Sequence, residues 1–525
     1  MYFNNKILVG KNKDKELAIL LNKANRHGLI TGASGTGKTI TLKVMAESFS
    51  DAGVPVFLAD VKGDLAGTAK RGELSDSLKE RIDSLKIPEF DFKEYPVRFW
   101  DLYQKYGHAL RVSIYDVGAS VLSIMLGLSE VQEGVLAICY RIAHDEGKMI
   151  YDIEDLKQLL IYVGEHKNEY TLKYGNITSQ SIGVIQRSLL ALEDQGADKF
   201  FGLPSLDIND FIQNNTEGRG YINILHAVEL FNSPDLYAAF LLHLLNRLFN
   251  DMPEVGDLDK PKMVFFFDEA HLLFDNMPAY RLKQIVQIVK LIRSRGVGLY
   301  FISQSPTDIP DEIIAQLGNR VQHNLRAYTP SELKAVKTAA NAFRANPKFD
   351  TETVIKELGT GEALISFQNE KGEPEVVERA TILPPQSKMG VLDDMERNRI
   401  INNSPLCGKY EEVIEKDDAA HLVLSKIYEE EKQVKEEEER KKAEEKERIE
   451  QEKQAEKERK EAEKLAKEKE RLEAKEQREL EKAEREAEKA RKNNPAYKIG
   501  KKVVNKSVDK VINKGLNKIM KNLFK

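Results

Sequence analysis

The chain has 525 residues, of which 31% are charged and 41% hydrophobic, and its formal net charge is −5. Residues 431–490 contain 20 Lys or Arg and 23 Glu, which leaves too few apolar side chains for a core. Residues 1–400 hold enough apolar side chains for one large α/β domain with insertions or for two smaller domains, so disorder of that part is excluded.

Charge is spread unevenly, with −12 on residues 1–430 and +10 on residues 491–525. The average surface of the main domain therefore does not attract phosphate. Two cysteines, Cys139 and Cys407, are too few for a secreted disulfide scaffold. The sequence has neither an apolar run of 18 residues nor a signal-peptide core, so we expect a cytoplasmic protein.

The chain opens with a strand at residues 6–10, followed by a polar turn and a helix-sized segment up to Asn25. Beyond it, short apolar runs alternate with turns and with helices whose apolar residues are three and four apart. This alternation predicts an α/β fold in which parallel strands are joined by crossover helices. The predicted strands are residues 27–31, 55–59, 220–225, 263–267, 298–303, 320–325 and 363–367.

Residues 68–215 show mainly helical periodicity, and we predict them to be a largely helical insertion. Its clearest helices are at residues 121–128, 132–143 and 179–192, and residues 86–96 and 110–115 are candidates for short strands. The predicted domains are a core of residues 1–67 and 216–390, this insertion, a linker of residues 391–412 with a helix at 394–403, a rod of residues 413–492 and a tail of residues 493–525.

The rod is rich in Ala, Glu, Lys and Arg, which predicts a long charged helix with Glu–Lys pairs four residues apart. Its large apolar residues between positions 445 and 490 are sparse: Ile449, Leu465, Leu472 and Leu480. Without a sustained heptad seam, both a solvated spacer helix and a coiled-coil dimer remain open.

The tail alternates lysines with apolar residues such as Val504, Val508 and Val511, which predicts a basic amphipathic helix. Three partners fit such a helix: an anionic membrane, nucleic acid, or an acidic protein surface that includes the chain's own acidic body.

The motif with the clearest chemistry is a phosphate-binding loop of the form G-x-x-x-x-G-K-[ST] between a predicted strand and a predicted helix. Glycine backbone N–H groups can surround the β-phosphate, Lys38 can contact the β- and γ-phosphates, and the Thr39 hydroxyl can bind Mg²⁺. The predicted ATP-binding residues are Gly32, Ala33, Ser34, Gly35, Thr36, Gly37, Lys38, Thr39 and Ile40.

A hydrolytic P-loop site needs acidic groups at the end of a neighbouring strand. Asp268 and Glu269 follow the apolar run of residues 263–267, so we predict Asp268 as a metal-shell residue and Glu269 as the group that polarises water. Gln304, after the next strand, is a candidate to sense the γ-phosphate or to orient that water. Asp60, at the end of the second predicted strand, either reaches the magnesium shell or organises a turn.

P-loop motors often complete the site with an arginine from the adjacent subunit, because negative charge develops on the γ-phosphoryl group. The candidates are Arg293, Arg295, Arg320 and Arg326, and each is also compatible with an ordinary surface position.

These motifs resemble the HerA/FtsK branch of RecA-like P-loop ATPases, and more closely the bacterial HerA-like helicase family. The matching stretches extend to about residue 390 and include residues 25–28, 57–65, 291–298, 316–323, 343–347 and 359–364. Only 31 residues precede the P-loop, so we do not expect the N-terminal barrel that many HerA proteins carry.

The resemblance implies a RecA-like core, a homo-oligomeric ring that is usually a hexamer, and ATP bound between subunits. It also implies that Arg293, eleven residues before Gln304, is the arginine that reaches the neighbour's site, with Arg295 next. Three functions remain open: an ATPase motor that translocates DNA, a same-fold ATPase acting on a protein or membrane-bound assembly, and a structural adaptor switched by ATP.

Overall fold

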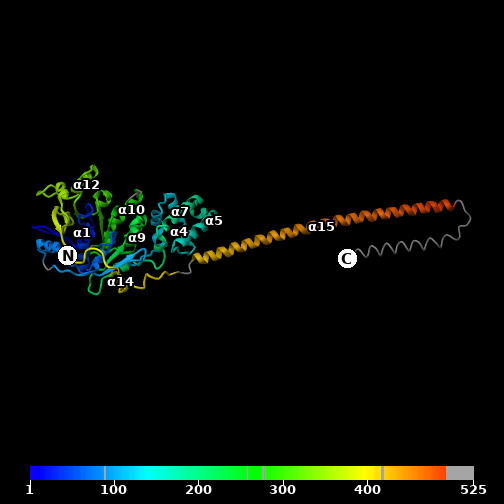
Figure 1. The fold of residues 1–525 in the computed structure, drawn as a ribbon. Coiled ribbons are helices and arrows are strands. Elements are labelled where there is room, and N and C mark those ends of the chain that lie inside the picture. The colour runs from blue at the N-terminus through cyan, green and yellow to red at the C-terminus, as the bar shows by residue number, and fades with distance from the viewer. Residues whose placement is uncertain (88–89, 257, 275–276, 278, 415–418, 492–525) are drawn as a thin grey trace. The chain divides into compact units, whose positions relative to one another are not determined.

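A computed structural model describes residues 1–87, 90–256, 258–274, 277, 279–414 and 419–491 (Figure 1). The chain divides into two compact units, Met1–Leu424 and Ser425–Lys525. None of the described helices combines the length and the apolar character that a membrane crossing requires. The predicted amphipathic tail, residues 493–525, lies outside the described residues.

The first unit is built on a mixed sheet with the strand order β1-β2-β13-β12-β11-β4-β10-β9-β5-β8-β6-β7, and β3 pairs with β2 outside this path. Every pairing from β11 to β7 is parallel, whereas β1, β2, β3, β12 and β13 join by antiparallel pairings. The parallel strands are β4 (Gly28–Thr31), β5 (Val56–Asp60), β6 (Val97–Asp101), β7 (His108–Ala109), β8 (Ile222–His226), β9 (Met263–Phe267), β10 (Val297–Ser303) and β11 (Asn319–Gln322). The predicted α/β fold with a mainly parallel sheet is confirmed.

Helices cover both faces of the parallel strands, because successive side chains of a strand point to opposite faces. On one face, Phe57 of β5 packs against Phe240 of α9 (Pro234–Asp251), and α10 (Ala279–Ile292) joins the same core. On the other face, Phe266 packs against Phe49 of α1 (Lys38–Asp51). All four aromatic side chains are fully buried, and each burial stabilises the fold by roughly 1.5–3 kcal/mol.

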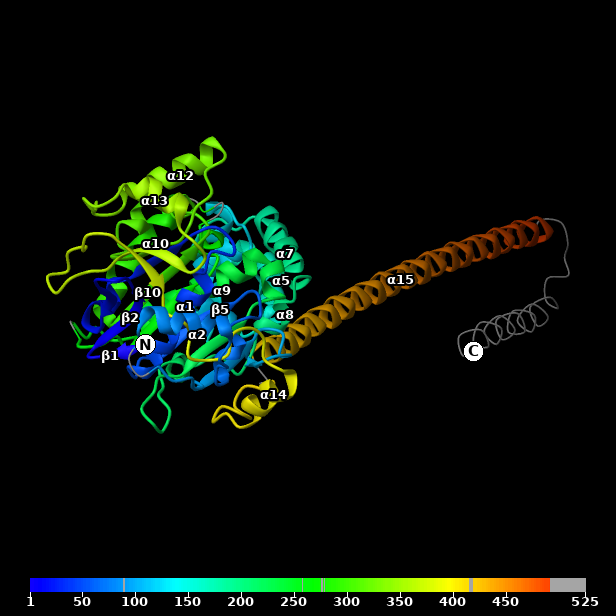
Figure 2. The same ribbon diagram turned by 60° about the vertical axis from the view of Figure 1, so that its left-hand side comes forward.

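The region predicted as a helical insertion contains α2 (Asp76–Leu85), α3 (Ile114–Met125), α4 (Glu130–Asp145), α5 (Ile153–Glu165), α6 (Lys167–Tyr174), α7 (Ser179–Glu193) and α8 (Ala197–Phe200). Helices α4, α5 and α7 group together in Figure 1, and α5 lies beside α7 in Figure 2 as well. The strands predicted at residues 86–96 and 110–115 are wrong for the residues that the structure describes there, which are 86–87, 90–96 and 110–115. Strands β6 and β7 lie just outside those runs, and β6 pairs with β8 and so extends the main sheet.

The helix predicted between the first strand and Asn25 is also wrong. β2 (Lys6–Lys11) turns back into β3 (Glu16–Leu20), and a 3-10 helix, Leu21–Arg26, follows. Leu17 and Ile19 are buried, and Ala18 between them is less so, which is the alternation of a half-covered strand. The Asn12 side chain accepts bonds from the N–H groups of Asp14 and Lys15, which closes the hairpin turn.

The remaining elements of the first unit are three strands of the antiparallel part of the sheet and four helices. They are β1 (Tyr2–Phe3), β12 (Glu362–Ser366), β13 (Glu378–Ile382), α11 (Asp311–Ile314), α12 (Pro330–Asn341), α13 (Thr351–Glu357) and α14 (Asp394–Asn402). β13 was not predicted because three of its five residues are only half buried and its apolar run is short.

The rod forms the helix α15, Ala419–Arg491, as predicted. Ion pairs four residues apart support it, among them Glu437 with Lys441 and Glu463 with Lys467. Leu465 is 70% exposed and Leu480 is 62% exposed in the single chain. The choice between a spacer helix and a coiled coil stays a prediction.

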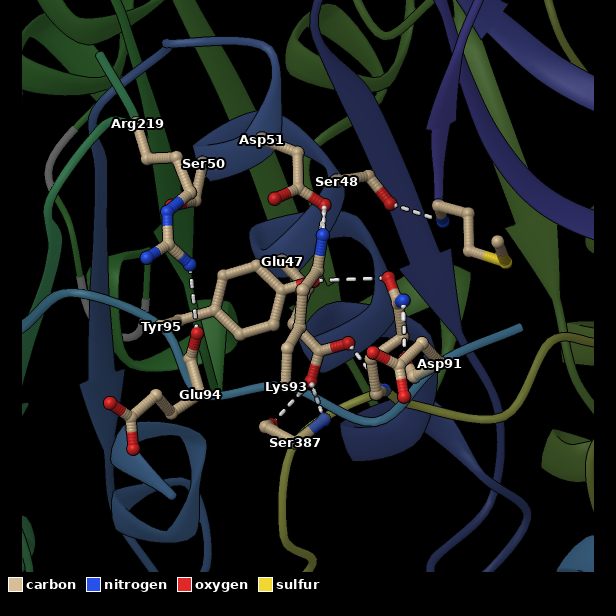
Figure 3. A network of polar contacts seen from close by, with 12 residues as sticks. Glu47, Ser48, Ser50, Asp51, Asp91, Lys93, Glu94, Tyr95, Arg219 and Ser387 are labelled. Atoms are coloured by element: carbon tan, nitrogen blue, oxygen red, sulfur yellow. Dashed lines mark hydrogen bonds and ion pairs between the residues drawn. The ribbon is translucent and has the colours of Figure 1, made fainter. Parts of the chain in front are cut away.

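A buried polar network anchors helix α1 behind the P-loop (Figure 3). The Glu47 carboxylate is 2% exposed and accepts hydrogen bonds from the N–H of Gln386 at 2.8 Å and the N–H of Ser387 at 3.2 Å. Asp51, one turn further along α1, pairs with Lys93 at 2.7 Å and accepts from the Tyr95 hydroxyl at 3.1 Å. Burial raises the pKa of Glu47, and the charge of Lys43 and the hydrogen bonds from Ser387 and Gln386 oppose that rise.

We expect Glu47→Ala to lower the free energy of unfolding by about 3 kcal/mol, because two buried N–H groups lose their acceptor. Glu47→Gln keeps an acceptor and removes a buried charge, so its loss is about 1 kcal/mol. Denaturant unfolding of the two variants and the wild type checks this ranking. Equal stability of all three proteins would contradict it.

Candidate nucleotide site

The predicted P-loop connects the end of β4 to the start of α1. Gly32, Gly35 and Gly37 have φ values of 155°, 79° and 114°, which glycine adopts without the steric cost of a Cβ. A Cβ on Gly37 would also come within 3.3 Å of the Gly361 backbone, which is tighter than an ordinary contact. The loop therefore has the backbone shape that the motif predicts.

Most backbone N–H groups of the loop are not used by the fold itself. Ala33 N–H donates to the C=O of Asn324 at 2.8 Å, and Thr36 N–H reaches the C=O of Ala33 at 3.4 Å. The N–H groups of Ser34, Gly35, Gly37, Lys38 and Thr39 are among those that have no acceptor among the described residues. Together with the positive end of α1, these N–H groups form a cradle suited to a phosphate.

Lys38 lies at the first position of α1 and folds back over the loop. Its Nζ donates to the C=O of Gly32 at 2.5 Å and to the C=O of Ala33 at 3.2 Å. Burial lowers the pKa of Lys38, and the charges of Glu269 and Asp268 oppose that change. The two acidic residues are thus close enough to Lys38 to influence its charge.

Strand pairing explains how the acidic residues come near the loop. β10 lies between β4 and β9, with Ser303 beside Thr31 and Phe301 beside Phe267. The P-loop and Asp268 therefore leave the same carboxyl edge of the sheet, about 10 Å apart at the usual strand spacing.

Glu269 adopts a strained conformation at this edge. Its φ and ψ are both 47°, in the left-handed region that a glutamate rarely enters. The residue is 7% exposed, and its Oε2 has no hydrogen-bond partner among the described residues. Nδ1 of His271 lies 3.6 Å from this Oε2. A buried carboxylate oxygen that the fold leaves unpaired is suited to bind a water molecule.

Asp268 is held by its neighbours and carries a raised pKa. Its Oδ1 accepts from the Glu269 N–H at 2.9 Å, and its C=O accepts from the Tyr237 hydroxyl at 2.9 Å. Burial, followed by the charge of Glu269, raises the pKa of Asp268 to about 7, and the ammonium groups of Lys62 and Lys38 oppose this. A bound cation would return this carboxyl group to its charged form.

This raised pKa predicts a pH-dependent stability. The stability that Asp268 contributes is fully present below pH 3.8, its ordinary pKa, and is lost as the pH rises through about 7. Without added metal, Asp268→Asn does not show this loss. The free energy of unfolding of the variant, relative to that of wild type, should therefore rise by about 1–2 kcal/mol from pH 5 to pH 8 after solvent screening. Denaturant unfolding at the two pH values measures the gain, and an unchanged difference would contradict it.

Gln304 follows β10 and is exposed at the rim of a cavity of about 570 Å³. The same cavity is lined by Ala33 and Ser34 of the P-loop and by His271. The strand end behind Gln304 is fixed, because Asp308 accepts bonds from the Ser303 hydroxyl at 2.6 Å and from the Ser305 N–H at 2.8 Å. The structure thus brings together the P-loop, the residues after β9, and Gln304.

Sequence reasoning assigned no role to His323, which lies beneath the P-loop. Its Nδ1 is 3.0 Å from the C=O of Glu362, and its Nε2 is 2.9 Å from the Thr41 hydroxyl. A Cβ on Gly32 would meet the His323 Cβ at 2.5 Å. Burial lowers the pKa of His323 to about 4, so the ring is neutral and donates from Nδ1. His323 lies inside the strand predicted at residues 320–325, whereas β11 ends at Gln322 and leaves His323 at the carboxyl edge of the sheet.

Residues 5–520 match the protein family described as Helicase HerA-like C-terminal. The chain belongs to this family. Two archaeal relatives of this HerA-like chain are named DNA double-strand break repair helicase HerA. The protein of Sulfurisphaera tokodaii is 22% identical over 68% of this chain and 66% of its own length. The protein of Saccharolobus solfataricus is 21% identical over 79% of this chain and 73% of its own length.

Solved structures of moderate similarity include two bacterial proteins. The conjugative coupling protein TrwB aligns over 73% of the HerA-like chain and 93% of its own, with 12% identity and a TM-score of 0.48. VirB4 of Thermoanaerobacter pseudethanolicus aligns over 75% of the HerA-like chain and 99% of its own, with 15% identity and a TM-score of 0.45.

The arginine candidates of the HerA-like chain differ in how far its own fold uses them. Arg320 donates to three backbone C=O groups, at 2.7, 3.1 and 3.2 Å, and Arg295 donates to the C=O of Met252 while covering the Phe249 ring. Arg293 is half buried and has no side-chain hydrogen bond or ion pair with the described residues. Arg326 is exposed and lines the same cavity as Gln304.

Arg293 precedes β10, at the amino edge of the sheet, whereas its own P-loop lies at the carboxyl edge. The seven residues of β10 put about 20 Å between the two edges. Arg293 therefore lies too far from its own P-loop to contact a nucleotide bound there.

The residues present fit a magnesium–nucleotide complex. Mg²⁺ in such sites is bound by one or two protein oxygen ligands together with substrate phosphates. Among the described residues no group of three or more His, Cys, Asp or Glu side chains is arranged to hold a metal ion by itself. The Thr39 hydroxyl and the Asp268 carboxylate remain the predicted protein ligands.

Proposed function

We propose that this HerA-like chain is an ATPase that binds MgATP at residues 32–40 and hydrolyses it. The observation that carries the proposal is the set of unused N–H groups in the P-loop, at the same sheet edge as Asp268 and the unpaired Glu269 carboxylate. The membership of the HerA-like family supports it.

In the proposed mechanism the loop N–H groups and Lys38 bind the β- and γ-phosphates, and Thr39 and Asp268 would hold Mg²⁺, which supplies charge neutralisation. Glu269 accepts a hydrogen bond from the attacking water and takes its proton. Gln304 orients that water from the next strand. Phosphoryl transfer needs chiefly positioning and charge stabilisation, which these fixed groups provide.

We further propose that the chain assembles as a homo-oligomeric ring, with a hexamer as the expected size, and that hydrolysis moves DNA. The site of each subunit would be completed by Arg293 of its neighbour, since Arg293 lies at the opposite sheet edge from its own P-loop. The names of the two relatives support DNA as the substrate. The predicted core, insertion, linker, rod and tail are the proposed domains, and the basic tail would bind DNA, an anionic membrane or an acidic protein.

The second candidate is an ATPase of the same fold that acts on a protein or membrane-bound assembly. The net charge of −12 on residues 1–430 favours it, because an acidic surface repels DNA unless basic side chains are concentrated where DNA passes.

ATP turnover with and without DNA tests the choice. The DNA-motor proposal expects the hydrolysis rate of the full chain to rise when duplex or single-stranded DNA is added at low salt, with native mass reporting the ring. A rate that neither DNA changes would favour the second candidate, and no ATP turnover at all would contradict the ATPase proposal.

A further inference from the structure

The turn after β5 displays one lysine at the edge of the nucleotide site. Asp60 is 1% exposed, and its carboxylate accepts backbone hydrogen bonds from Gly63 at 2.7 Å, Asp64 at 3.1 Å and Leu65 at 3.0 Å. Gly63 has φ 77°, which the tight turn requires. Of the two roles considered for Asp60 from the sequence, it therefore has the role of organising the turn. In doing so it fixes the backbone that carries Lys62.

Strand pairing places this turn beside the residues after β9. β5 runs parallel to β9 with Leu58 opposite Phe266, so Asp60 comes out level with Asp268 on the neighbouring strand. Adjacent strands are about 4.8 Å apart, and a lysine side chain spans about 6 Å. Lys62, two residues beyond Asp60, can therefore reach the space in front of Asp268.

Lys62 is exposed and makes no hydrogen bond or ion pair within the described part of the chain. Its charge nevertheless acts on the site: it lowers the pKa of Asp268 more than Lys38 does, and it lowers the pKa of Lys38. Lys62 is therefore held near a second cation, Lys38, without an ion-pair partner. The electrostatic energy of such a cation improves most when an anion binds beside it.

We propose that Lys62 binds the terminal phosphate of ATP from the β9 side of the site, as a second cation from the same subunit as Lys38. This inference rests on the proposed ATPase function. Asp268 and Glu269 repel the γ-phosphate. Lys62 offsets this repulsion from the side of these two residues, whereas Lys38 approaches the phosphate from the P-loop side. Because ADP lacks the γ-phosphate, Lys62 distinguishes ATP from ADP.

The test is equilibrium binding of ADP and of a non-hydrolysable ATP analogue, both with Mg²⁺ and without DNA. Lys62→Ala should weaken binding of the analogue about 10-fold and change ADP binding less than about 2-fold, because one charge-assisted contact is lost. Lys62→Arg should restore much of the difference. Lys371→Ala is the matched control, since Lys371 is exposed in the turn between β12 and β13 and should change neither affinity.

Equal weakening of both nucleotides, or of neither, would overturn the assignment of Lys62 to the terminal phosphate. Unchanged nucleotide affinities with weaker DNA binding would overturn it as well, because Lys62 would then contact a polynucleotide. If wild type binds and hydrolyses ATP while Lys62→Ala behaves like wild type, this inference fails and the ATPase proposal stands. If wild type binds neither nucleotide, both fail.

Discussion

Glu269→Gln is expected to keep ATP binding and to lower kcat by at least about 10³-fold, because the amide cannot take the proton of the attacking water. The substitution conserves the shape of the side chain at its strained backbone position, where φ is 47°. It also removes a buried charge whose Oε2 has no hydrogen-bond partner among the described residues, so stability should not fall. Steady-state ATP turnover and binding of a non-hydrolysable analogue measure the two effects.

Glu332→Gln provides the control, because Glu332 lines the same cavity as Gln304 but caps the start of α12 and has no proposed role in hydrolysis. Its turnover should stay within about 3-fold of wild type. Near-normal turnover by Glu269→Gln would show that another group activates the water.

Arg293→Ala is expected to lower kcat by about 10³-fold or more if its guanidinium acts on the γ-phosphoryl group of the neighbouring subunit. The ATP affinity of each subunit should change little, since this arginine lies about 20 Å from its own P-loop. Mixing Arg293→Ala with Lys38→Ala should restore part of the turnover. In mixed rings some interfaces then pair an intact P-loop with an intact arginine.

Arg320→Ala separates this role from a structural one. Arg320 donates to three backbone C=O groups of its own chain, so its removal should lower the unfolding temperature and not produce rescue on mixing. Absence of rescue by Arg293→Ala, when native mass shows that the mixed subunits assemble together, would contradict the shared site.

The sequence predicted those features that depend on contiguous residues. The P-loop and the run from Met263 to Glu269 carry their chemistry within nine residues or fewer, and the strand–loop–helix context was visible around both. Strands β4, β5, β8, β9 and β10 were predicted to within two residues at each end because continuous apolar runs mark strands buried on both faces.

Features that depend on tertiary pairing were not predicted. The residues of β3 have the composition of a short helix. Their alternation of buried and less buried side chains identifies a strand only once the antiparallel pairing with β2 is known. β6 joins the main sheet through β8, more than 100 residues away in sequence. His323 and Lys62 belong to the site only because β11 and β5 end near the P-loop and near Asp268, and the sequence around them does not carry that information.

Hydrogen exchange of the backbone amides between residues 32 and 40 tests the central claim most directly. On adding a non-hydrolysable ATP analogue with Mg²⁺, the N–H groups of Ser34, Gly35, Gly37, Lys38 and Thr39 should become strongly protected, because phosphate oxygens become their acceptors. Lys38→Ala should lose most of this protection at the same analogue concentration. Saturating nucleotide that leaves the exchange of these amides unchanged would contradict the account.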